Sequence, residues 1–183
     1  METLETINWR ASLKGHISSR EIEEDKIQKI LEAGRMAPSA RNSQPWRFIV
    51  VRDKKTIESM ADSLFVGPML KDVPVILIAF ANPGDDIVRD GKEYYLFDVA
   101  LAVENMVLAA TDLGLVTHLI ASANEDALKE ALGVPDEVRF VIATPLAYPA
   151  AASYEEAAKE RLTQRTRKSL PEIAYADTWA KPF

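Results

Sequence analysis

Apolar residues recur along the chain with two different periods, and these periods predict its secondary structure. A helical period occurs in residues 23–36, 54–64, 94–113 and 124–132. Short apolar runs of strand length occur at 46–51, 74–80, 117–121 and 138–148. Helices and strands follow one another without an internal repeat or a low-complexity linker. The pattern therefore predicts a single α+β domain over residues 1–183, built around a layered sheet.

Local signals mark the ends of these helices. Pro38 should stop the first helix, because the residue before a proline is pushed out of the helical conformation. Gly114 can end the long third helix in a left-handed conformation. Side chains suited to N-cap a helix precede two of these segments, namely Asp53 and Asn124, and Ser153 opens a further short helix within the capping-box pattern S-x-x-E.

The segment 94–113 is apolar on nearly every face of the helix that it predicts. Four polar residues interrupt it: Asp98, Glu104, Asn105 and Asp112. A helix that spans a lipid bilayer tolerates few such residues. We therefore expect a helix buried inside a soluble protein, with sheet on one side and a partner on another, and no membrane association.

The tail from about Leu162 is polar, basic and without a helical period. It nevertheless carries Tyr175, Trp179 and Phe183, and it has no core of its own to receive their rings. Exposed apolar groups of this size usually mark an interface. The tail is therefore expected to pack on something else, such as a second subunit.

The amino-acid composition argues against several classes of function for this protein. With 28 acidic and 22 basic residues the net charge is −6, which argues against a general electrostatic grip on nucleic acid or an anionic membrane. The chain has no cysteine and two histidines, so a disulfide scaffold, a thiol nucleophile, an iron–sulfur cluster and a His-rich metal centre are not expected. The first ten residues lack the basic stretch and apolar core of a secretory signal, and we expect a cytoplasmic protein.

The familiar catalytic and phosphate-binding motifs are missing from the sequence. It contains neither G-x-G-x-x-G nor a P-loop, and neither G-x-S-x-G nor H-E-x-x-H. His16 lies in a polar stretch and is expected in a turn or at the surface, and His118 is expected to be structural. We therefore predict no catalytic side chain and no metal site. The chemistry would rest on carboxylates or on an organic cofactor.

The segment 10–14 is one of two that are hard to explain as plain structure. In an extended chain Arg10, Ser12 and Lys14 point the same way, because alternate residues share a face. Two cations and a hydroxyl on one face suit a phosphate monoester. The alternative is a solvated surface strand.

The second such segment is 37–46, A-P-S-A-R-N-S-Q-P-W, in which two prolines bracket small and amide residues. A rigid loop of this kind presents backbone groups and the Asn42 and Gln44 amides. These groups could match the edge of a planar heterocycle that both donates and accepts hydrogen bonds. The alternative is an ordinary connection from helix to strand, with Trp46 in the core.

Together, these two segments resemble the nitroreductase family of FMN-dependent oxidoreductases. Their order is R-x-S-x-K, a helix, and then A-P-S-x-x-N-S-Q-P-W-x-F-I-V-V. The long helix from Asp98 to Leu115 is similar to the family's central helix. Two later segments are also similar to family motifs: Leu132–Pro135 to L-G-[IV]-P, and Arg167–Ile173 to R-x-x-L-x-E-I, followed by Trp179. The resemblance covers nearly the whole chain.

The resemblance implies a layered α+β fold whose central mixed or antiparallel sheet is flanked by helices. It also implies a homodimer that exchanges its tails and holds two FMN sites at its interface. The phosphate and ribityl chain would be bound by Arg10, Ser12 and Lys14, with Ala11 between them, and by Arg165 and Arg167. The isoalloxazine ring would be bordered by Pro38, Ser39, Ala40 and Asn42 of the other subunit, with backbone amides near Ile120 and Ala121 on its redox-active side.

The activity implied is hydride transfer from NAD(P)H to a nitroaromatic or quinone-type acceptor by a ping-pong mechanism. The short segment 82–93 implies an open substrate site, because larger family members carry extra helices there. Other flavin-dependent reactions, such as reductive dehalogenation or dehydrogenation, are an alternative. A non-catalytic flavin-binding protein and a structural dimer without flavin are two more.

Overall fold

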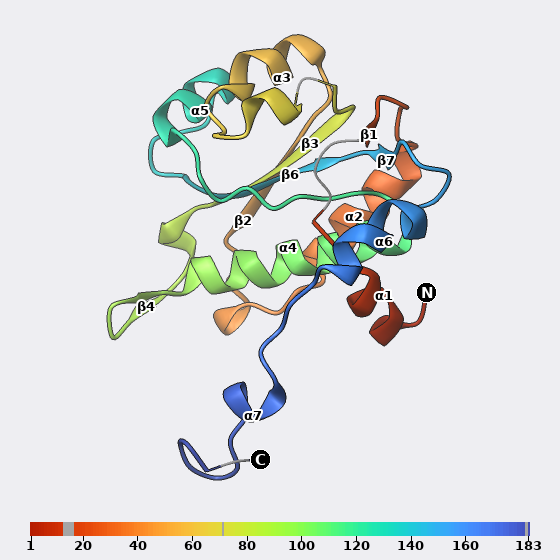
Figure 1. The fold of residues 1–183 in the computed structure, drawn as a ribbon. Coiled ribbons are helices and arrows are strands. Elements are labelled where there is room, and N and C mark those ends of the chain that lie inside the picture. The colour runs from red at the N-terminus through yellow and green to blue at the C-terminus, as the bar shows by residue number, and fades with distance from the viewer. Residues whose placement is uncertain (13–16, 71, 182) are drawn as a thin grey trace.

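The computed structural model describes residues 1–12, 17–70, 72–181 and 183 (Figure 1). Its centre is a three-stranded antiparallel sheet in the order β2-β3-β6, formed by Trp46–Val51, Val75–Ala81 and Arg139–Leu146. Strand β2 pairs with β3 along its whole length, and β3 pairs with β6 with one irregularity beside Phe80. The predicted α+β class and the predicted strands at 46–51 and 74–80 are confirmed, and β6 forms most of the strand predicted at 138–148.

Helices cover both faces of this sheet, so that β3 is buried along its whole length. Four helices form the outer layers: α2 (Glu24–Arg35) and α4 (Tyr94–Asp112) on one face, and α3 (Lys54–Ala61) and α5 (Glu125–Leu132) on the other. Side chains of β3 alternate between the two layers. Phe80 packs with Met60 of α3, whereas Leu77 packs with Met106 of α4. An unbroken apolar run is the sequence that such a strand requires.

The predicted capping residues lie where the helices begin. Asp53 accepts a hydrogen bond from the Thr56 amide at 2.8 Å. Asn124 and Ser153 accept equivalent bonds at the start of α5 and of α6 (Tyr154–Thr163). Helix α2 ends before Pro38 as predicted, and Gly114 follows α4 with a left-handed φ of 76°.

Helix α4 has a buried face and an apolar exposed face. Asp98 is the one charged residue that it buries. Its outer face leaves Leu96, Phe97 and Leu101 44%, 55% and 49% exposed. By length and composition α4 could cross a membrane, but 50% of that stretch is buried inside the protein, as in the core helix of a soluble fold.

A smaller assembly lies around the last turns of α4. Helix α1 (Thr3–Trp9) and helix α6 pack there around Ala11, Val116 and Tyr154. Beside them β1 (Ile17–Ser18) pairs with β7 (Tyr148–Pro149).

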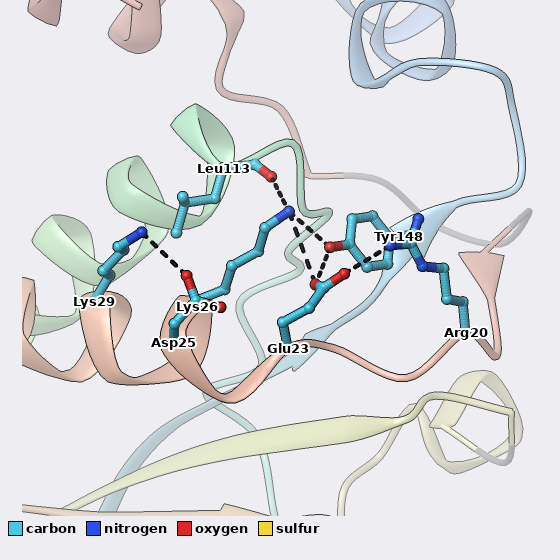
Figure 2. A network of polar contacts seen from close by, with 7 residues as sticks. All are labelled: Arg20, Glu23, Asp25, Lys26, Lys29, Leu113 and Tyr148. Atoms are coloured by element: carbon cyan, nitrogen blue, oxygen red, sulfur yellow. Dashed lines mark hydrogen bonds and ion pairs between the residues drawn. The ribbon is translucent and has the colours of Figure 1, made fainter.

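A polar cluster fastens β7 to the start of α2 and the end of α4 (Figure 2). Lys26 donates to the Tyr148 hydroxyl at 2.6 Å and to the Leu113 carbonyl at 3.4 Å. Tyr148 in turn donates to the Glu23 carboxylate, which also accepts from Arg20. The Tyr148 hydroxyl, the nearby backbone and Arg20 together lower the pKa of Glu23 to about 2.

Two predicted strands differ from the structure. The segment 117–121 is not a strand: Thr117 pairs with Ser12 and Ile120 with Ala143 in isolated bridges. Its neighbours change from one residue to the next, so no ladder forms. The strand predicted at 138–148 is two strands, β6 and β7, which pair with different partners.

Short elements are added that the apolar pattern did not predict. Besides α1 and β1 these are the 3-10 turns Ala40–Asn42, Gly67–Leu70 and Pro83–Asp85, and a hairpin of β4 (Val88–Arg89) and β5 (Lys92–Glu93). The hairpin turns at Asp90-Gly91, with φ values of 53° and 73°. Asp-Gly is the dipeptide that a two-residue hairpin turn favours.

The tail beyond α6 extends away from the layered body (Figure 1). Its described residues include one short helix, α7 (Leu170–Ile173), which begins with a capping box between Ser169 and Glu172. Trp179 and Phe183 are 87% and 88% exposed. As predicted, the tail has no local core that buries these rings.

Candidate functional site

A polar cavity of about 320 Å³ brings together residues from both ends of the chain. It is lined by Arg10, Ala11, Ser12, Arg161, Gln164, Arg165, Thr166 and Arg167. Five of these residues, Arg10, Ala11, Ser12, Arg165 and Arg167, are among those that the family resemblance implied at the phosphate and ribityl chain of FMN. They meet because α1 and α6 pack on each other, which places the segment after α1 beside the segment after α6. Lys14, the remaining predicted cation, lies outside the described residues.

The segment after α1 is held from two sides. The Ala11 amide donates to the Tyr154 hydroxyl at 3.1 Å, and the Ala11 side chain is buried. Ser12 pairs with Thr117 in a parallel bridge. These contacts fix the backbone from which Arg10 reaches the cavity.

Arg165 connects the two segments directly. Its guanidinium donates to the Asn8 carbonyl at 2.8 Å and to the Arg10 carbonyl. Burial, then the charges of Arg167 and Arg10, lower the pKa of Arg165. Arg165 therefore shapes the cavity wall, while Arg10 and Arg167 carry the donors that are left for a ligand.

The cavity concentrates positive charge. Among the residues that the structure describes, none of its four arginines forms an ion pair with a carboxylate, although ion pairs are formed elsewhere on the surface. Cations gathered without counter-charges repel one another, and an anion relieves that repulsion. Guanidinium groups with a hydroxyl nearby match the geometry of a phosphate.

The second predicted segment forms a closed loop ahead of β2. Three residues that are not glycine have left-handed φ angles there: Arg41 at 52°, Asn42 at 59° and Gln44 at 50°. Such angles persist when surrounding contacts determine them, and they cluster at functional sites. The backbone amide of Gln44 donates to the Ser39 hydroxyl at 3.0 Å. The Ala40 amide donates to the Asp98 carboxylate of α4 at 2.7 Å.

Within one chain the loop and the cavity lie at opposite ends of α4. The bond from Ala40 places the loop beside Asp98, in the second turn of the helix. Ser12 pairs with Thr117, which follows the last turn. From Asp98 to Asp112 the helix rises by about 21 Å at 1.5 Å per residue. The structure thus assembles the predicted cationic residues but keeps the exposed Pro38 and Asn42 away from them.

The predicted amides near Ile120 differ in what they can offer. The Ile120 amide donates to the Ala143 carbonyl at 2.8 Å, and its carbonyl accepts from the Ala143 amide at 2.9 Å. Its side chain is buried in the core beneath α3 and α5. The Ile120 donor is therefore already used within the chain, and the place of this stretch beside a flavin stays a prediction. Ala121 is exposed.

Sequence reasoning missed some of the site residues. Arg161, Gln164 and Thr166 also line the cavity. The spacing R-x-x-x-R-x-R at 161–167 was the available signal, because it places three cations close together where α6 ends and the tail begins. No group of three or more potential metal ligands occurs in the part of the chain that the structure describes.

Comparisons with known proteins agree with this architecture. A family model described as "Nitroreductase family" matches residues 7–67 and 64–148 of this chain. An Archaeoglobus fulgidus protein, named provisionally as an NADH dehydrogenase/NAD(P)H nitroreductase, is 34% identical over 152 residues, which are 81% of this chain and 86% of that protein.

Solved structures resemble the whole chain. A nitroreductase family protein from Clostridium novyi NT is 35% identical and has a TM-score of 0.79, covering 100% of this chain and 97% of that one. A Desulfovibrio desulfuricans structure in complex with FMN is 25% identical and has a TM-score of 0.81, covering 98% of each chain. On the family match and these relatives, the chain belongs to the nitroreductase family of NAD(P)H oxidoreductases.

Proposed function

We propose that this chain is an FMN-dependent oxidoreductase that passes hydride from NAD(P)H to nitroaromatic or quinone-type acceptors by a ping-pong mechanism. The observation that carries the proposal is the cavity of about 320 Å³ with four arginines and no carboxylate partner for any of them among the described residues. A charged phosphate monoester is the ligand class that such a cavity suits.

The residues present fit the phosphate end of FMN. Arg10 and Arg167 offer guanidinium donors, Ser12 a hydroxyl, and Arg161 a further cation from the last turn of α6. When bound, FMN supplies the hydride-accepting chemistry, which no side chain can provide. The eight residues that line the cavity include no carboxylate and no histidine. Their contribution is to bind and orient the cofactor.

We further propose that the active form is a homodimer. The outer face of α4 exposes Leu96, Phe97 and Leu101, and the tail exposes Trp179 and Phe183. Soluble monomers rarely leave so much apolar surface in contact with water. In a dimer with exchanged tails, the loop at 38–42 of one subunit would reach the cavity of the other. Each of the two sites would then hold the phosphate with one chain and border the ring with its partner.

The substrate side of the site is expected to be open. The segment between β3 and α4 contains one 3-10 turn and the β4–β5 hairpin, and residues of this hairpin are exposed. No long insertion is present there to cover a flavin. NAD(P)H and a small aromatic or quinone-like oxidant could therefore use the same face in turn, as a ping-pong mechanism requires.

The direct test is the absorption spectrum of the purified protein, followed by anaerobic titration. We expect about one FMN per chain, bleaching by NADH or NADPH, and recovery of the oxidised spectrum when a quinone or nitroaromatic is added. Extraction of FAD, or no flavin binding after reconstitution with FMN, would overturn the proposal. Flavin that stays oxidised with both nicotinamides would instead indicate a flavin-binding protein without this activity.

A further inference from the structure

Asp98 is an unusual residue for its position. It is 4% exposed and lies on the face of α4 that packs against the interior. Burying a carboxylate is costly unless it is well partnered. Its hydrogen-bond donor is the Ala40 amide at 2.7 Å, the first residue of the 3-10 turn in the loop.

A second carboxyl group, that of Asp86, affects the ionisation of Asp98. Asp86, just before β4, accepts from the Ile87 amide with one oxygen, while its other oxygen is buried and makes no hydrogen bond of normal geometry with the described residues. The Ser43 hydroxyl is also buried and makes no hydrogen bond of normal geometry in the described part of the chain, but it lies near enough to Asp98 to lower the pKa of that carboxyl and so opposes the effect of burial. The other charged side chains nearby are paired elsewhere or face solvent. Asp85 forms an ion pair with Arg47, and Arg41 is exposed.

Two neighbouring carboxyl groups that are shielded from water do not both ionise easily. Burial is the main cause that raises the pKa of Asp98, the Ala40 amide opposes it, and the charge of Asp86 raises it further.

We propose that Asp98 is a positioning residue: its buried carboxyl group accepts from the Ala40 amide and so fixes the loop at 39–44 against the flavin ring. This inference rests on the proposed function. The loop needs such an anchor, because Arg41, Asn42 and Gln44 adopt left-handed conformations that residues with a Cβ rarely keep by themselves. Asp98 acts from inside the protein and makes no contact with a substrate.

The test compares Asp98→Ala with Asp98→Asn. Asparagine keeps an oxygen that can accept from Ala40, whereas alanine removes it. Asp98→Ala should weaken FMN and riboflavin equally, by at least about tenfold, the factor expected for one lost charge-assisted hydrogen bond. Asp98→Asn should bind both ligands nearly as the wild type does. Flavin fluorescence measures the affinities, and Asp85→Asn is the matched control, since Asp85 pairs with Arg47 and not with Ala40.

A pH series separates positioning from simple folding stability. Riboflavin is the ligand of choice, because it has no phosphate to titrate. The wild type should lose affinity as falling pH adds a proton to the Asp98 carboxyl, because a neutral carboxyl accepts more weakly from the Ala40 amide, while Asp98→Asn should have a flat profile. These measurements decide the question even where Asp98→Ala does not fold.

Three results would overturn the inference. Asp98→Ala could bind both ligands as the wild type does, or it could weaken FMN alone, which would place Asp98 at the phosphate end. The wild type and Asp98→Asn could also have identical pH profiles. If the wild type bound neither flavin, the proposed function would fail together with this inference, whereas the first three results leave the proposed function intact.

Discussion

The four arginines of the cavity are not equivalent at the scale of single residues. The Arg165 guanidinium donates to the carbonyls of Asn8 and Arg10. Removing this side chain would therefore disturb the wall of the cavity as well as the charge of the cavity. Arg10 has no ion-pair partner among the described residues and sits on a backbone fixed by Tyr154. It is therefore the cleaner residue with which to test phosphate binding.

Arg10→Ala should weaken FMN binding by roughly 10- to 150-fold, which corresponds to about 1.5–3 kcal/mol for one hydrogen bond to a charged group. Riboflavin, which lacks the phosphate, should lose much less affinity. Titration of both flavins by fluorescence quenching checks this. Equal losses for the two ligands would indicate a folding defect or a different role for Arg10.

Glu23 makes stability depend on pH. Its pKa is about 2 in the folded protein against an ordinary 4.5, chiefly because the Tyr148 hydroxyl donates to it. A lowered folded-state pKa stabilises the protein above the unfolded value, and this stabilisation is lost as pH falls from 4.5 towards 2.

Glu23→Gln should therefore be less stable than the wild type at neutral pH, and the difference should shrink below pH 4.5. Thermal unfolding across this range measures it, with Glu24→Gln as a control at the next position. Glu24 is exposed and pairs with Arg52 outside the cluster. A difference that stayed constant with pH would show that the contact with Tyr148 does not set the titration of Glu23.

At the scale of elements, α2 and α4 approach each other closely at Gly34. A Cβ placed there would lie 2.2 Å from the Cε and 2.8 Å from the Cγ of Met106. We expect Gly34→Ala to destabilise the protein by about 1–3 kcal/mol through overpacking, reduced by up to about 1 kcal/mol from the better helix propensity of alanine.

Urea unfolding checks this value, and a double-mutant cycle with Met106→Ala identifies its cause. Shortening Met106 opens space that the new methyl group can use, so the double variant should be more stable than the sum of the two single changes predicts. Strict additivity would mean that Gly34 is needed for another reason.

Elements with strong local signals could be predicted from sequence, and those made by long-range pairing could not. The helix ends followed from side chains such as Asp53 and Asn124, which act on backbone within the next turn. The segment at Thr117 looked like a strand because its residues favour one, yet pairing partners distant in sequence decide that it makes only isolated bridges.

The same distinction applies to the candidate site. The cations Arg10, Arg165 and Arg167 could be grouped only through the family resemblance, because residues 155 positions apart meet through the packing of α1 on α6. Arg161 was missed because the motifs that carry the resemblance do not include it, although its spacing from Arg165 and Arg167 was a signal. The bond from Ala40 to Asp98 is a tertiary contact across 58 positions and has no local signature.

At the scale of the whole molecule, the exposed apolar surface is divided between α4 and the tail. The tail also carries Arg165 and Arg167, and so connects the expected subunit interface with the cavity. The expectation of a single domain over 1–183 stays a prediction.

Truncation after Leu162 should weaken the dimer and release FMN together. An obligate interface of this kind is expected to bury at least about 2,000 Å², and removal of the tail takes part of it away along with two cavity arginines. Light scattering and flavin fluorescence on the truncated chain measure the two effects. A stable monomer that retains its flavin would show that the site is built within one chain.

The separation of loop and cavity along α4 has a genetic consequence. If each site combines parts of two chains, an Arg10→Ala chain still carries a good loop, and an Asp98→Ala chain still carries a good cavity. Neither variant alone could build a sound site, but a mixed dimer would contain one site made of both intact halves. Two defective proteins refolded together should therefore regain a flavin affinity that neither has alone, as complementing alleles do. Sites contained within single chains could never be repaired in this way.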